Sequence, residues 1–354
     1  MANELWGVPT PVQDLAAGGA APVPPNRYVL RDQDRHGGLH AADEIPEPIP
    51  LIDLSRLPSD DEAAKLRAAL QSWGLLLATN HGVEASLLDD VMRAGREFFL
   101  LPPEEKKKYS NMIDGKHFQK DGYGHETVRS EDQILDWLDR LRLTLEPEDE
   151  RDYTLCPSRP ESFRDLLNDY TSKTKKLRDR ILREISKLLE IDVDYFVNHV
   201  NKDQAITFAR FAYYPACARP DLVFGIRPHS DGRLLTIILV DEHVGGLQVQ
   251  KDGKWYNVQT MPDTLLVVLG DSMQIMSNGI FESSVHRVVT NDEKDRISLS
   301  VFYGVPGETM LEPVPSSLDK DRPARYKKMK AEDYIRIFEE HHSRGERLIH
   351  SMKI

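Results

Sequence analysis

The sequence predicts a mainly β protein with flanking α-helices, built on a double-stranded β-helix (jelly-roll) core. Two observations support this fold class. Short apolar and β-branched runs, separated by turns rich in Gly, Pro, Asn and Asp, fill residues 201–306. Amphipathic helical patterns precede and follow these runs. Many short strands with helices at both ends are typical of a jelly-roll barrel.

The bulk composition is that of a globular protein with a large core. The 354 residues are 40% hydrophobic and 29% charged, and the net charge is −12. This negative charge argues against a nucleic-acid partner. The two cysteines, Cys156 and Cys217, are too few for a disulfide framework and suit a reducing compartment. No signal sequence opens the chain and no apolar run approaches the roughly 20 residues of a membrane span. We therefore expect a cytoplasmic protein without a membrane partner.

Two regions are expected before the core. Residues 1–48 are rich in Ala, Gly and Pro and predict an extended N-terminal arm that lies on the body. Residues 49–200 predict an α/β region whose long amphipathic helix backs the barrel as a scaffold. The expected helices are 60–73, one from 84, one from 103, 161–189 and 193–200, and the expected strands are 51–54, 74–79 and 140–143, with a turn at 122–124.

The jelly-roll core, residues 201–306, is followed by a C-terminal helix or lid, residues 307–354. Helical spacing over residues 332–349 predicts one closing helix with Phe338 directed inward. The histidines expected on its solvated face are His341, His342 and His350. The strands expected in the core are 208–215, 222–226, 234–240, 245–250, 253–255, 265–271, 284–289 and 295–302.

A His-x-Asp motif, His229-Ser230-Asp231, follows the apolar run 222–226. Because side chains alternate along a strand, His229 and Asp231 are expected on one face. A second imidazole is available from His286, in a β-branched stretch that predicts another strand of the same barrel. Two neutral imidazoles and one carboxylate form the ligand set of a ferrous site that leaves positions open.

A second pair of polar residues lies ten positions after this histidine. Arg296 and Ser298 are two residues apart, so on a strand they share a face. A planar guanidinium beside a hydroxyl is suited to hold a carboxylate, because the guanidinium can donate two parallel charge-assisted hydrogen bonds.

The His-x-Asp pair, the distant histidine and the Arg-x-Ser pair together resemble the Fe(II)- and 2-oxoglutarate-dependent dioxygenases, in particular their plant branch. The resemblance implies Fe(II) held by His229, Asp231 and His286, with 2-oxoglutarate and O2 as cosubstrates and ascorbate as a reductant. It further implies decarboxylation of 2-oxoglutarate and removal of hydrogen from a C–H bond of a small-molecule substrate. The residues implied for the 2-oxoglutarate site are Arg296, Ser298 and Tyr214.

One position departs from the family pattern. The strand that contains Tyr214 has Ala212 where the family usually has Asn. The loss of one hydrogen bond to a ligand costs about 0.5–1.5 kcal/mol. We therefore expect weaker or slightly reoriented binding of 2-oxoglutarate, with the activity retained and the iron site unaffected.

Within the family, the stretches 113–116, 133–137 and 224–232 are similar to the grass oxygenases that hydroxylate triketone herbicides. This similarity implies hydroxylation, or another oxidation, of a small plant metabolite or hormone. It also implies triketone herbicides as further substrates.

In relatives, the strand after a Trp-x-Asp pattern contributes side chains to the substrate pocket, which by resemblance implies Leu141 and Arg142. Two alternatives remain for Arg142. It is either a surface charge or an inward guanidinium that would favour an anionic or strongly polar substrate. The other residues expected in the pocket are Phe208, Arg210, Phe302 and Phe338.

Two other functions remain open from the residues alone. An oxidase of the same fold could use iron and O2 without 2-oxoglutarate, a reading that Ala212 makes worth naming. A non-catalytic barrel could bind a metabolite, although such a protein needs no metal triad with open positions.

Overall fold

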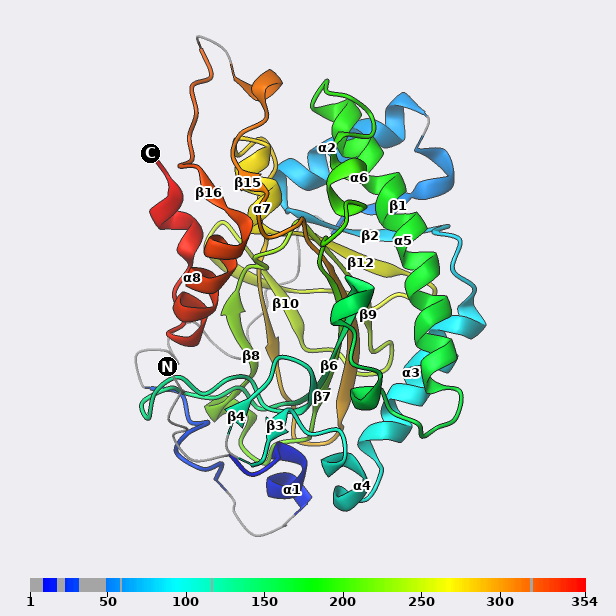
Figure 1. Cartoon of the computed structure of the whole chain (residues 1–354), viewed down its shortest axis with the longest axis vertical. Coiled ribbons are helices and arrows are strands. Elements are labelled where there is room, and N and C mark those ends of the chain that lie inside the picture. Colours follow the sequence, from blue (N-terminus) through cyan, green and yellow to red (C-terminus); the bar gives the residue numbers. More distant parts are fainter. Residues whose placement is uncertain (1–8, 18–22, 32–48, 58, 116, 319–320) are drawn as a thin grey trace.

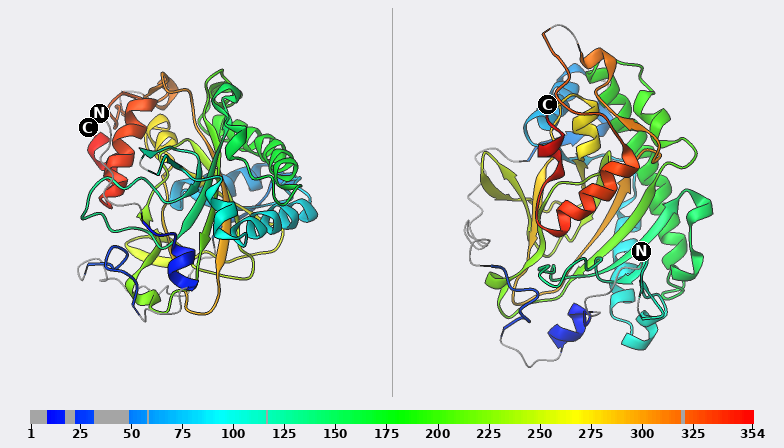
Figure 2. Two further views of the ribbon diagram at one scale, coloured as in Figure 1. Left: turned by 60° about the horizontal axis from the view of Figure 1, so that its bottom comes forward. Right: turned by 60° about the vertical axis from the view of Figure 1, so that its left-hand side comes forward.

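Two β-sheets face each other at the centre of the computed structural model, and helices cover the outer face of the larger sheet (Figure 1, Figure 2). The larger sheet has the strand order β1-β2-β12-β9-β14-β7-β6-β5, and the smaller has the order β11-β10-β13-β8. This arrangement confirms the predicted jelly-roll fold class. The residues that the structure describes are 9–17, 23–31, 49–57, 59–115, 117–318 and 321–354.

The predicted elements are found with small shifts at their ends. The strands of the larger sheet are β1 (Leu51–Asp53), β2 (Leu75–Thr79), β5 (Gly122–Gly124), β6 (Asp139–Glu146), β7 (Thr207–Tyr214), β9 (Leu235–Val240), β12 (Leu265–Leu269) and β14 (Arg296–Tyr303). Those of the smaller sheet are β8 (Phe224–His229), β10 (Leu247–Lys251), β11 (Lys254–Asn257) and β13 (Val285–Val289). Two short hairpins are formed by β3 (Met112–Ile113) with β4 (His117–Phe118) and by β15 (Met310–Leu311) with β16 (Met329–Lys330).

The described α-helices are α1 (Val12–Ala17), α2 (Asp60–Ser72), α3 (Ala85–Phe99), α4 (Pro103–Lys107), α5 (Phe163–Leu188), α6 (Tyr195–Val200), α7 (Asp271–Met276) and α8 (Ala331–Ser343). Short 3₁₀ turns lie at Leu54–Arg56, Glu148–Glu150, Tyr153–Leu155, Pro220–Leu222, Pro315–Ser317 and Leu348–Met352. As expected, α2 begins after Ser59, whose hydroxyl accepts the amide N–H of Glu62.

Strand β7 shows how the alternation of side chains separates two cores. Phe211 and Tyr213 project outward and pack among residues of α3 and α5. Ala212 and Tyr214 project inward, into the apolar layer between the two sheets. In Figure 1, α3 and α5 lie along one side of the sheets and α8 lies on the other. The inner face of the larger sheet, together with α8, is therefore where a site can form.

The expected regions 49–200 and 201–306 share one sheet. Strands β1, β2, β5 and β6 come from the first region and extend the sheet that β7, β9, β12 and β14 of the second region form. Their outer faces contribute to one continuous apolar cluster. The two regions that meet at residue 200 are therefore parts of one sheet and share one hydrophobic core.

Residues 122–124 were expected to form a turn, and that prediction is wrong. They form β5, which pairs with β6, because glycines at both ends permit a close approach of the backbone to the segment 109–111. A Cβ atom at Gly122 would lie 2.6 Å from the carbonyl oxygen of Tyr109, and one at Gly124 would lie 2.2 Å from Oδ1 of Asn111.

Two helical predictions also need correction. The closing helix ends at Ser343 rather than near residue 349, because Gly345 adopts a positive φ of 75° and stops it. Helix α7 was not expected, and it begins at Asp271, the last residue of the strand that was expected over 265–271.

Most of the predicted N-terminal arm lies outside the described residues. The described part rests on the body, as expected, but it includes a helix, α1. The amide N–H groups of Val12 and Gln13 donate hydrogen bonds to the two carboxylate oxygens of Asp139, at 2.8 and 2.9 Å. This buried carboxylate anchors the arm to β6.

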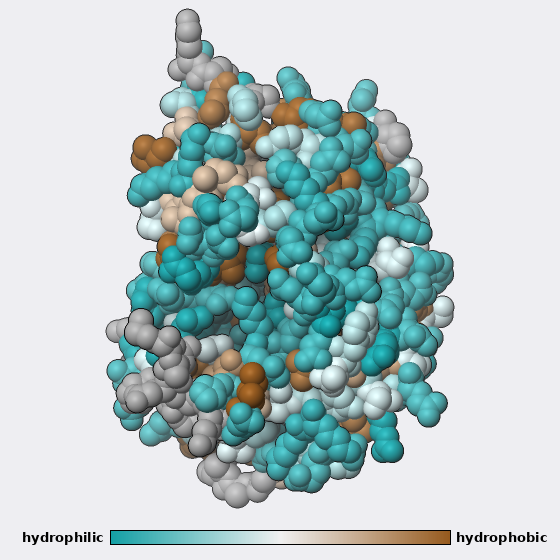
Figure 3. All heavy atoms as spheres, in the orientation of Figure 1, coloured by the Kyte–Doolittle hydropathy of each residue, from teal (hydrophilic) through white to brown (hydrophobic). Residues whose placement is uncertain are grey.

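One face of the molecule is mainly polar (Figure 3). Figure 3 shows this face covered largely by hydrophilic residues, with hydrophobic ones in small separate groups. Of the helices that the structure describes, none is long and apolar enough to cross a membrane.

Candidate active site

The two predicted histidine ligands lie opposite each other on neighbouring strands. His229 ends β8 and pairs in register with His286 of β13. Their ring centroids are 4.3 Å apart, and both side chains are buried. The long gap between them in the sequence is closed by one antiparallel ladder of the smaller sheet.

The carboxylate of Asp231 completes this cluster. One of its oxygens, Oδ1, lies 3.7 Å from Nε2 of His229 and 3.9 Å from Nε2 of His286. The other, Oδ2, accepts a hydrogen bond of 2.6 Å from the hydroxyl of Thr236. Asp231 lies in the loop just after β8, and not on the strand as expected. Thr236 thus holds a carboxylate that the strand itself does not orient.

Backbone carbonyls direct both imidazoles toward the same point. Nδ1 of His229 lies 2.8 Å from the carbonyl oxygen of Arg227, and Nδ1 of His286 lies 3.3 Å from that of Ser284. A proton on each Nδ1 leaves each Nε2 free as a ligand atom. Burial, followed by the nearby histidines, lowers the pKa of His229 well below its usual value, so the ring is neutral.

The three ligand atoms lie within 4.8 Å of one another. Two neutral imidazole nitrogens and one carboxylate oxygen form the donor set of a non-haem ferrous site with open positions. The residues present therefore fit Fe(II).

The predicted carboxylate clamp lies deeper between the sheets. Arg296 and Ser298 of β14 pair with Tyr214 and Ala212 of β7, respectively, and all four are buried. The guanidinium of Arg296 lies over the ring of Tyr214, 5.1 Å from its centroid. Its Nε and Nη1 atoms are buried without a hydrogen-bond partner. A buried guanidinium with free donors fits the distal carboxylate of 2-oxoglutarate.

The departure from the family pattern faces this clamp. Ala212 lies opposite Ser298, so a methyl group stands where an amide side chain could reach the same ligand. Weaker binding of 2-oxoglutarate remains a prediction.

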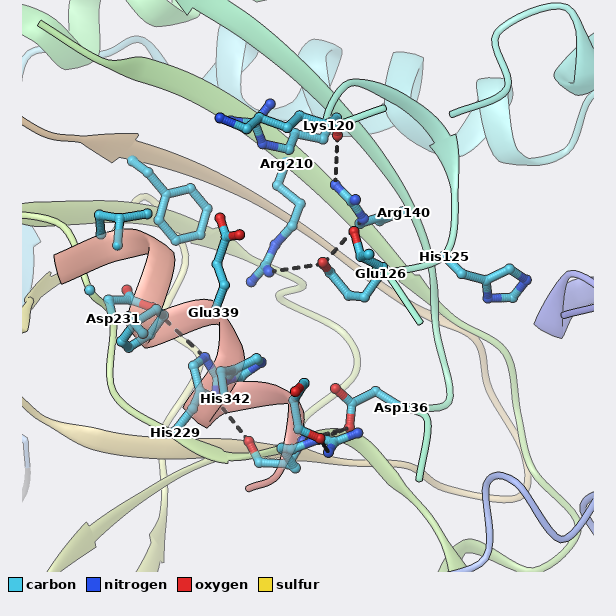
Figure 4. Close-up of a pocket in the computed structure, with 18 of the residues that line it drawn as sticks. Lys120, His125, Glu126, Asp136, Arg140, Arg210, His229, Asp231, Glu339 and His342 are labelled. Carbon is cyan, nitrogen blue, oxygen red and sulfur yellow. Dashed lines mark hydrogen bonds and ion pairs between the residues drawn. The ribbon is translucent and has the colours of Figure 1, made fainter. Parts of the chain in front are cut away.

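A cavity of about 200 Å³ lies beside the metal cluster, between the inner face of the larger sheet and α8 (Figure 4). His229 and Asp231 contribute to its wall. The predicted residues Arg142, Phe208, Arg210, Phe302 and Phe338 all line it. The remaining charged residues of its lining are Lys120, Glu126, Arg129, Asp136, Arg140, Arg227, Arg233 and Glu339.

Leu141 does not line the cavity, so that prediction is wrong. The residue is fully buried in the outer core, with Phe211 as its partner across the strands. Neighbours on a strand point to opposite faces, and Arg142 takes the inner one. Arg142 was predicted to be either a surface charge or an inward guanidinium, and in the structure its side chain lines the cavity.

The placement of His342 on the solvated face is also wrong. This residue lies on α8 one turn after Phe338, and its ring approaches that of His229 with 5.3 Å between centroids. In Figure 4 it extends from α8 toward His229. Helical spacing from Phe338 could have placed both residues on the same face.

Aromatic rings and guanidinium groups alternate along the cavity wall. Phe208 and Phe302 stack with 4.5 Å between centroids. Arg142 lies over the outer side of this pair at 4.0 Å from Phe208, and Arg210 lies 5.0 Å from Phe302. Each arginine thus gains a cation–π contact.

Acidic side chains neutralise only part of this charge. Asp121 forms an ion pair with Arg142. Glu126 is shared, at 3.1 Å from Nε of Arg140 and 3.7 Å from Nη1 of Arg210. Arg142 and Arg210 are therefore each held by a cation–π contact and an ionic contact, and the residues involved include members of β6, β7 and β14.

Two further cavity residues were missed by the sequence analysis. Burial, followed by the like charge of Arg142, lowers the pKa of Arg233 to about 10, which leaves it protonated at neutral pH. Burial, followed by the charge of Arg140, lowers the pKa of His125 to about 4. The only sequence signal for Arg233 was its position two residues after Asp231.

A buried polar network links α8 to the metal loop. The hydroxyl of Tyr334 donates a 2.7 Å hydrogen bond to Oδ2 of Asp271. The amide of Asp271 in turn donates a 2.7 Å bond to the carbonyl oxygen of Asp231. Burial raises the pKa of Asp271. The helix that covers the cavity is therefore tied to the loop that carries a metal ligand.

Comparisons with known proteins agree with this geometry. The family model described as the 2OG-Fe(II) oxygenase superfamily matches residues 204–305, and the model of the non-haem dioxygenase in morphine synthesis N-terminal region matches residues 49–161. Protein SRG1 of Arabidopsis thaliana is 35% identical, covering 91% of this chain and 90% of its own. Codeine O-demethylase of Papaver somniferum is also 35% identical, covering 92% of this chain and 90% of its own. The crystal structure of JOX2 in complex with 2OG, Fe and JA has a TM-score of 0.85 and 33% identity, covering 94% of both chains.

The chain therefore belongs to the 2OG-Fe(II) oxygenase superfamily. It is an oxidoreductase of the plant Fe(II)- and 2-oxoglutarate-dependent dioxygenase class, with Fe(II) as its metal and 2-oxoglutarate as a cosubstrate. These matches confirm the predicted family, reaction class and cofactors. They favour neither the oxidase without 2-oxoglutarate nor the non-catalytic barrel.

Proposed function

We propose that His229, Asp231 and His286 hold the iron and that Arg296 and Ser298, with the ring of Tyr214, hold 2-oxoglutarate. The convergence of three buried ligand atoms within 4.8 Å carries this assignment. The unpartnered donors of Arg296 support the second part of it. When bound, the iron and 2-oxoglutarate supply the oxidising chemistry for a C–H bond.

The chain itself positions the reactants. Thr236 and two backbone carbonyls hold the three side chains in place, and iron held by them would lie beside the cavity that His229 and Asp231 line. Phe208, Phe302 and Phe338 supply apolar surface for a small organic substrate, and α8 covers it. Shielding of the substrate from water by this helix suppresses competing reactions.

The assignment is tested by adding Fe(II) and 2-oxoglutarate anaerobically to the metal-free protein and recording the visible spectrum. A weak charge-transfer band of the chelated keto acid is expected. The band should be lost in Asp231→Ala and formed only at higher 2-oxoglutarate concentrations in Arg296→Leu. A protein that binds iron tightly but forms no band at high 2-oxoglutarate contradicts the proposed site.

We also propose that triketone herbicides are further substrates. The support is the combination of stacked aromatic rings and guanidinium groups along one wall, which suits a compact ring compound with several oxygen atoms. Release of succinate, measured with and without a triketone, tests this: no stimulation at saturating herbicide would overturn it.

A cytoplasmic location is inferred from the cysteines. Both Cys156 and Cys217 are free thiols, which a reducing compartment preserves. A fluorescent fusion expressed in plant cells would reveal any other compartment.

A further inference from the structure

Two cavity arginines, Arg210 and Arg233, lie on either side of Phe302 along the inner face of β14. We propose that they form an anion subsite, which takes the carboxylate of an organic-acid substrate whose ring packs against Phe208 and Phe302. This inference rests on the proposed function and names the class of its substrate.

Among the described residues, no carboxylate lies within ion-pair distance of Arg233, and Glu339 acts on its charge only from farther away. Arg233 lines the cavity, and none of the described residues forms a hydrogen bond or ion pair with its side chain. The side chain crosses Gly304, where a Cβ atom would lie only 2.9 Å from Cδ of Arg233. A glycine thus opens the path that brings this guanidinium into the cavity. A guanidinium held in a cavity without a counterion is an expensive arrangement unless an anion joins it.

Arg210 also has donor capacity to spare. Its Nε is buried without an acceptor, and its nearest carboxylate, Glu126, is 3.7 Å away and closer to Arg140. Arg210 pairs directly across the strands with Arg142. Like charges at directly opposite positions destabilise a sheet. The repulsion between Arg142 and Arg210 is relieved when an anion displaces solvent from the cavity and lies between the two guanidinium groups.

The charge of the cavity is opposite to that of the protein. Seven arginine or lysine side chains line it, against four carboxylates, one of which is the metal ligand Asp231. The whole chain carries a net charge of −12. A local excess of positive charge in an acidic protein raises the concentration of anions at this point.

This subsite is separate from the 2-oxoglutarate clamp. Arg296 and Gly304 are eight residues apart near the two ends of one strand, so they lie roughly 26 Å apart at about 3.3 Å per residue. The carboxylate that meets Arg296 therefore cannot also reach the guanidinium over Gly304. Two different anions are accommodated at the two ends of the inner face.

The shape of the wall between them indicates a ring beside the acid. The stacked pair of Phe208 and Phe302 presents a flat apolar surface next to Arg210. Helix α8 places Phe338 against Gly232 on the facing side, where a Cβ atom would lie 3.1 Å from the ring. A compact cyclic carboxylic acid satisfies both features.

Matched pairs of carboxylic acids and their methyl esters test the proposal. The probes are phenylacetic, cyclohexaneacetic, indole-3-acetic and jasmonic acids with their esters. Binding is measured by calorimetry to enzyme loaded with Fe(II) and 2-oxoglutarate in the absence of O2. At least one acid is expected to bind about tenfold or more tightly than its ester, since a charge-assisted hydrogen bond to a guanidinium is lost in the ester.

Variants locate the preference for the acid. Arg233→Leu and Arg210→Leu are each expected to weaken binding of that acid by about tenfold to a hundredfold while leaving the ester unchanged. Gly304→Ala displaces Arg233 without removing it, so this variant should also bind the acid more weakly than the wild type does. Arg183→Leu is the matched control, because this arginine of α5 lies outside the cavity and is paired with Asp194 at 2.7 Å.

Three results would overturn the proposal. They are equal binding of acid and ester throughout the panel, an unchanged preference for the acid in Arg233→Leu, and a loss of 2-oxoglutarate binding in Arg233→Leu equal to the loss of acid binding. The charge-transfer band separates these results from failure of the proposed function. Enzyme that forms the band but prefers no acid disproves only the anion subsite. Enzyme that forms no band yet prefers acids, through Arg233, supports the subsite and contradicts the proposed iron and 2-oxoglutarate site.

Discussion

The metal cluster and the substrate cavity adjoin each other but are built in different ways. His229 and His286 come from two paired strands, and backbone carbonyls set the direction of both rings. The cavity instead collects side chains from the segment 120–142, from β7 and β14, and from α8. Its charges are neutralised in part by ion pairs between elements that are distant in sequence, such as Arg129 with Glu339.

This difference indicates how one fold can serve many substrates. The ligands depend on the backbone ladder, which tolerates few changes. The cavity residues depend on neighbouring side chains, so they can be exchanged without altering the ladder. If this comparison is right, substitutions at the cluster should abolish the reaction, and those in the cavity should change stability or substrate binding.

The largest effect is expected from His286→Ala. Loss of one imidazole opens the triad, and even residues that only orient a ligand cost about tenfold to a hundredfold in metal affinity or activity. We expect iron content near zero and a loss of succinate release greater than a hundredfold. Iron analysis and a succinate assay measure these. His243→Ala, at an exposed loop position, should retain both.

A buried cavity histidine, His125, should contribute to the loss of stability in acid. The pKa of buried His125 is lowered to about 4, against about 6.5 in the unfolded chain, so the unfolded chain binds a proton first as the pH falls. The stability that the neutral ring preserves is complete above pH 6.5 and decreases toward pH 4. Between these limits, the free energy of unfolding of the wild type should fall by about 3 kcal/mol more than that of His125→Phe. Urea unfolding of the metal-free proteins tests this, and parallel pH profiles would contradict it.

Arg296→Leu should separate 2-oxoglutarate binding from iron binding. Hydrogen bonds to charged groups contribute about 1.5–3 kcal/mol, so the dissociation constant for 2-oxoglutarate should rise by about tenfold to a hundredfold. Leucine leaves no unpaired charge between the sheets. Titration of the charge-transfer band measures the change, while iron content should stay at the wild-type value. Loss of iron along with 2-oxoglutarate would show that the two sites are not independent.

Tyr334→Phe should loosen the link between the two regions. The variant removes the hydrogen bond to the buried Asp271, which costs about 1–2 kcal/mol of stability. Because α8 covers the cavity, the KM for substrate should rise while the affinity for 2-oxoglutarate is retained. Chemical denaturation and steady-state kinetics measure the two effects. Tyr153→Phe, on the exposed surface, should change stability by less than about 0.5 kcal/mol.

The smallest effect is expected from Ala212→Asn. An amide beside Ser298 could donate one hydrogen bond to bound 2-oxoglutarate, worth about 0.5–1.5 kcal/mol, which corresponds to about twofold to tenfold tighter binding. Titration of the charge-transfer band again measures it. Ala212→Val, of similar burial but without a donor, is the control. If Ala212→Asn binds 2-oxoglutarate no more tightly than the wild type does, an asparagine at this position does not contribute to 2-oxoglutarate binding in this chain.

Much of the site was visible in the sequence, because its parts are local patterns. The His-x-Asp motif and the Arg-x-Ser pair each place two functional groups two residues apart. Alternation along β7 likewise placed Phe208 and Arg210 on the face of Tyr214, as the structure shows. These relationships follow from strand geometry alone and do not require knowledge of the rest of the fold.

Alternation could not decide which face of a new strand is the inner one. That is why Leu141 was assigned to the pocket together with Arg142, although two neighbours on a strand cannot both face it. The helix end at Ser343 and the turn expected at 122–124 failed for a related reason. Their outcomes depend on a backbone conformation at Gly345 and on a close approach to residues 109–111.

By itself, the sequence predicted the fold class, the proposed metal ligands and the proposed carboxylate clamp, because each is indicated by short spacings between residues or by the order of strands. Only the tertiary structure decided the character of the cavity. It brought Arg233, Glu126 and His342 together from segments that lie about a hundred residues apart, and their charge and burial arise from that convergence. Ladders are local and periodic, whereas a cavity is formed by whatever side chains the packing of distant elements leaves facing one another.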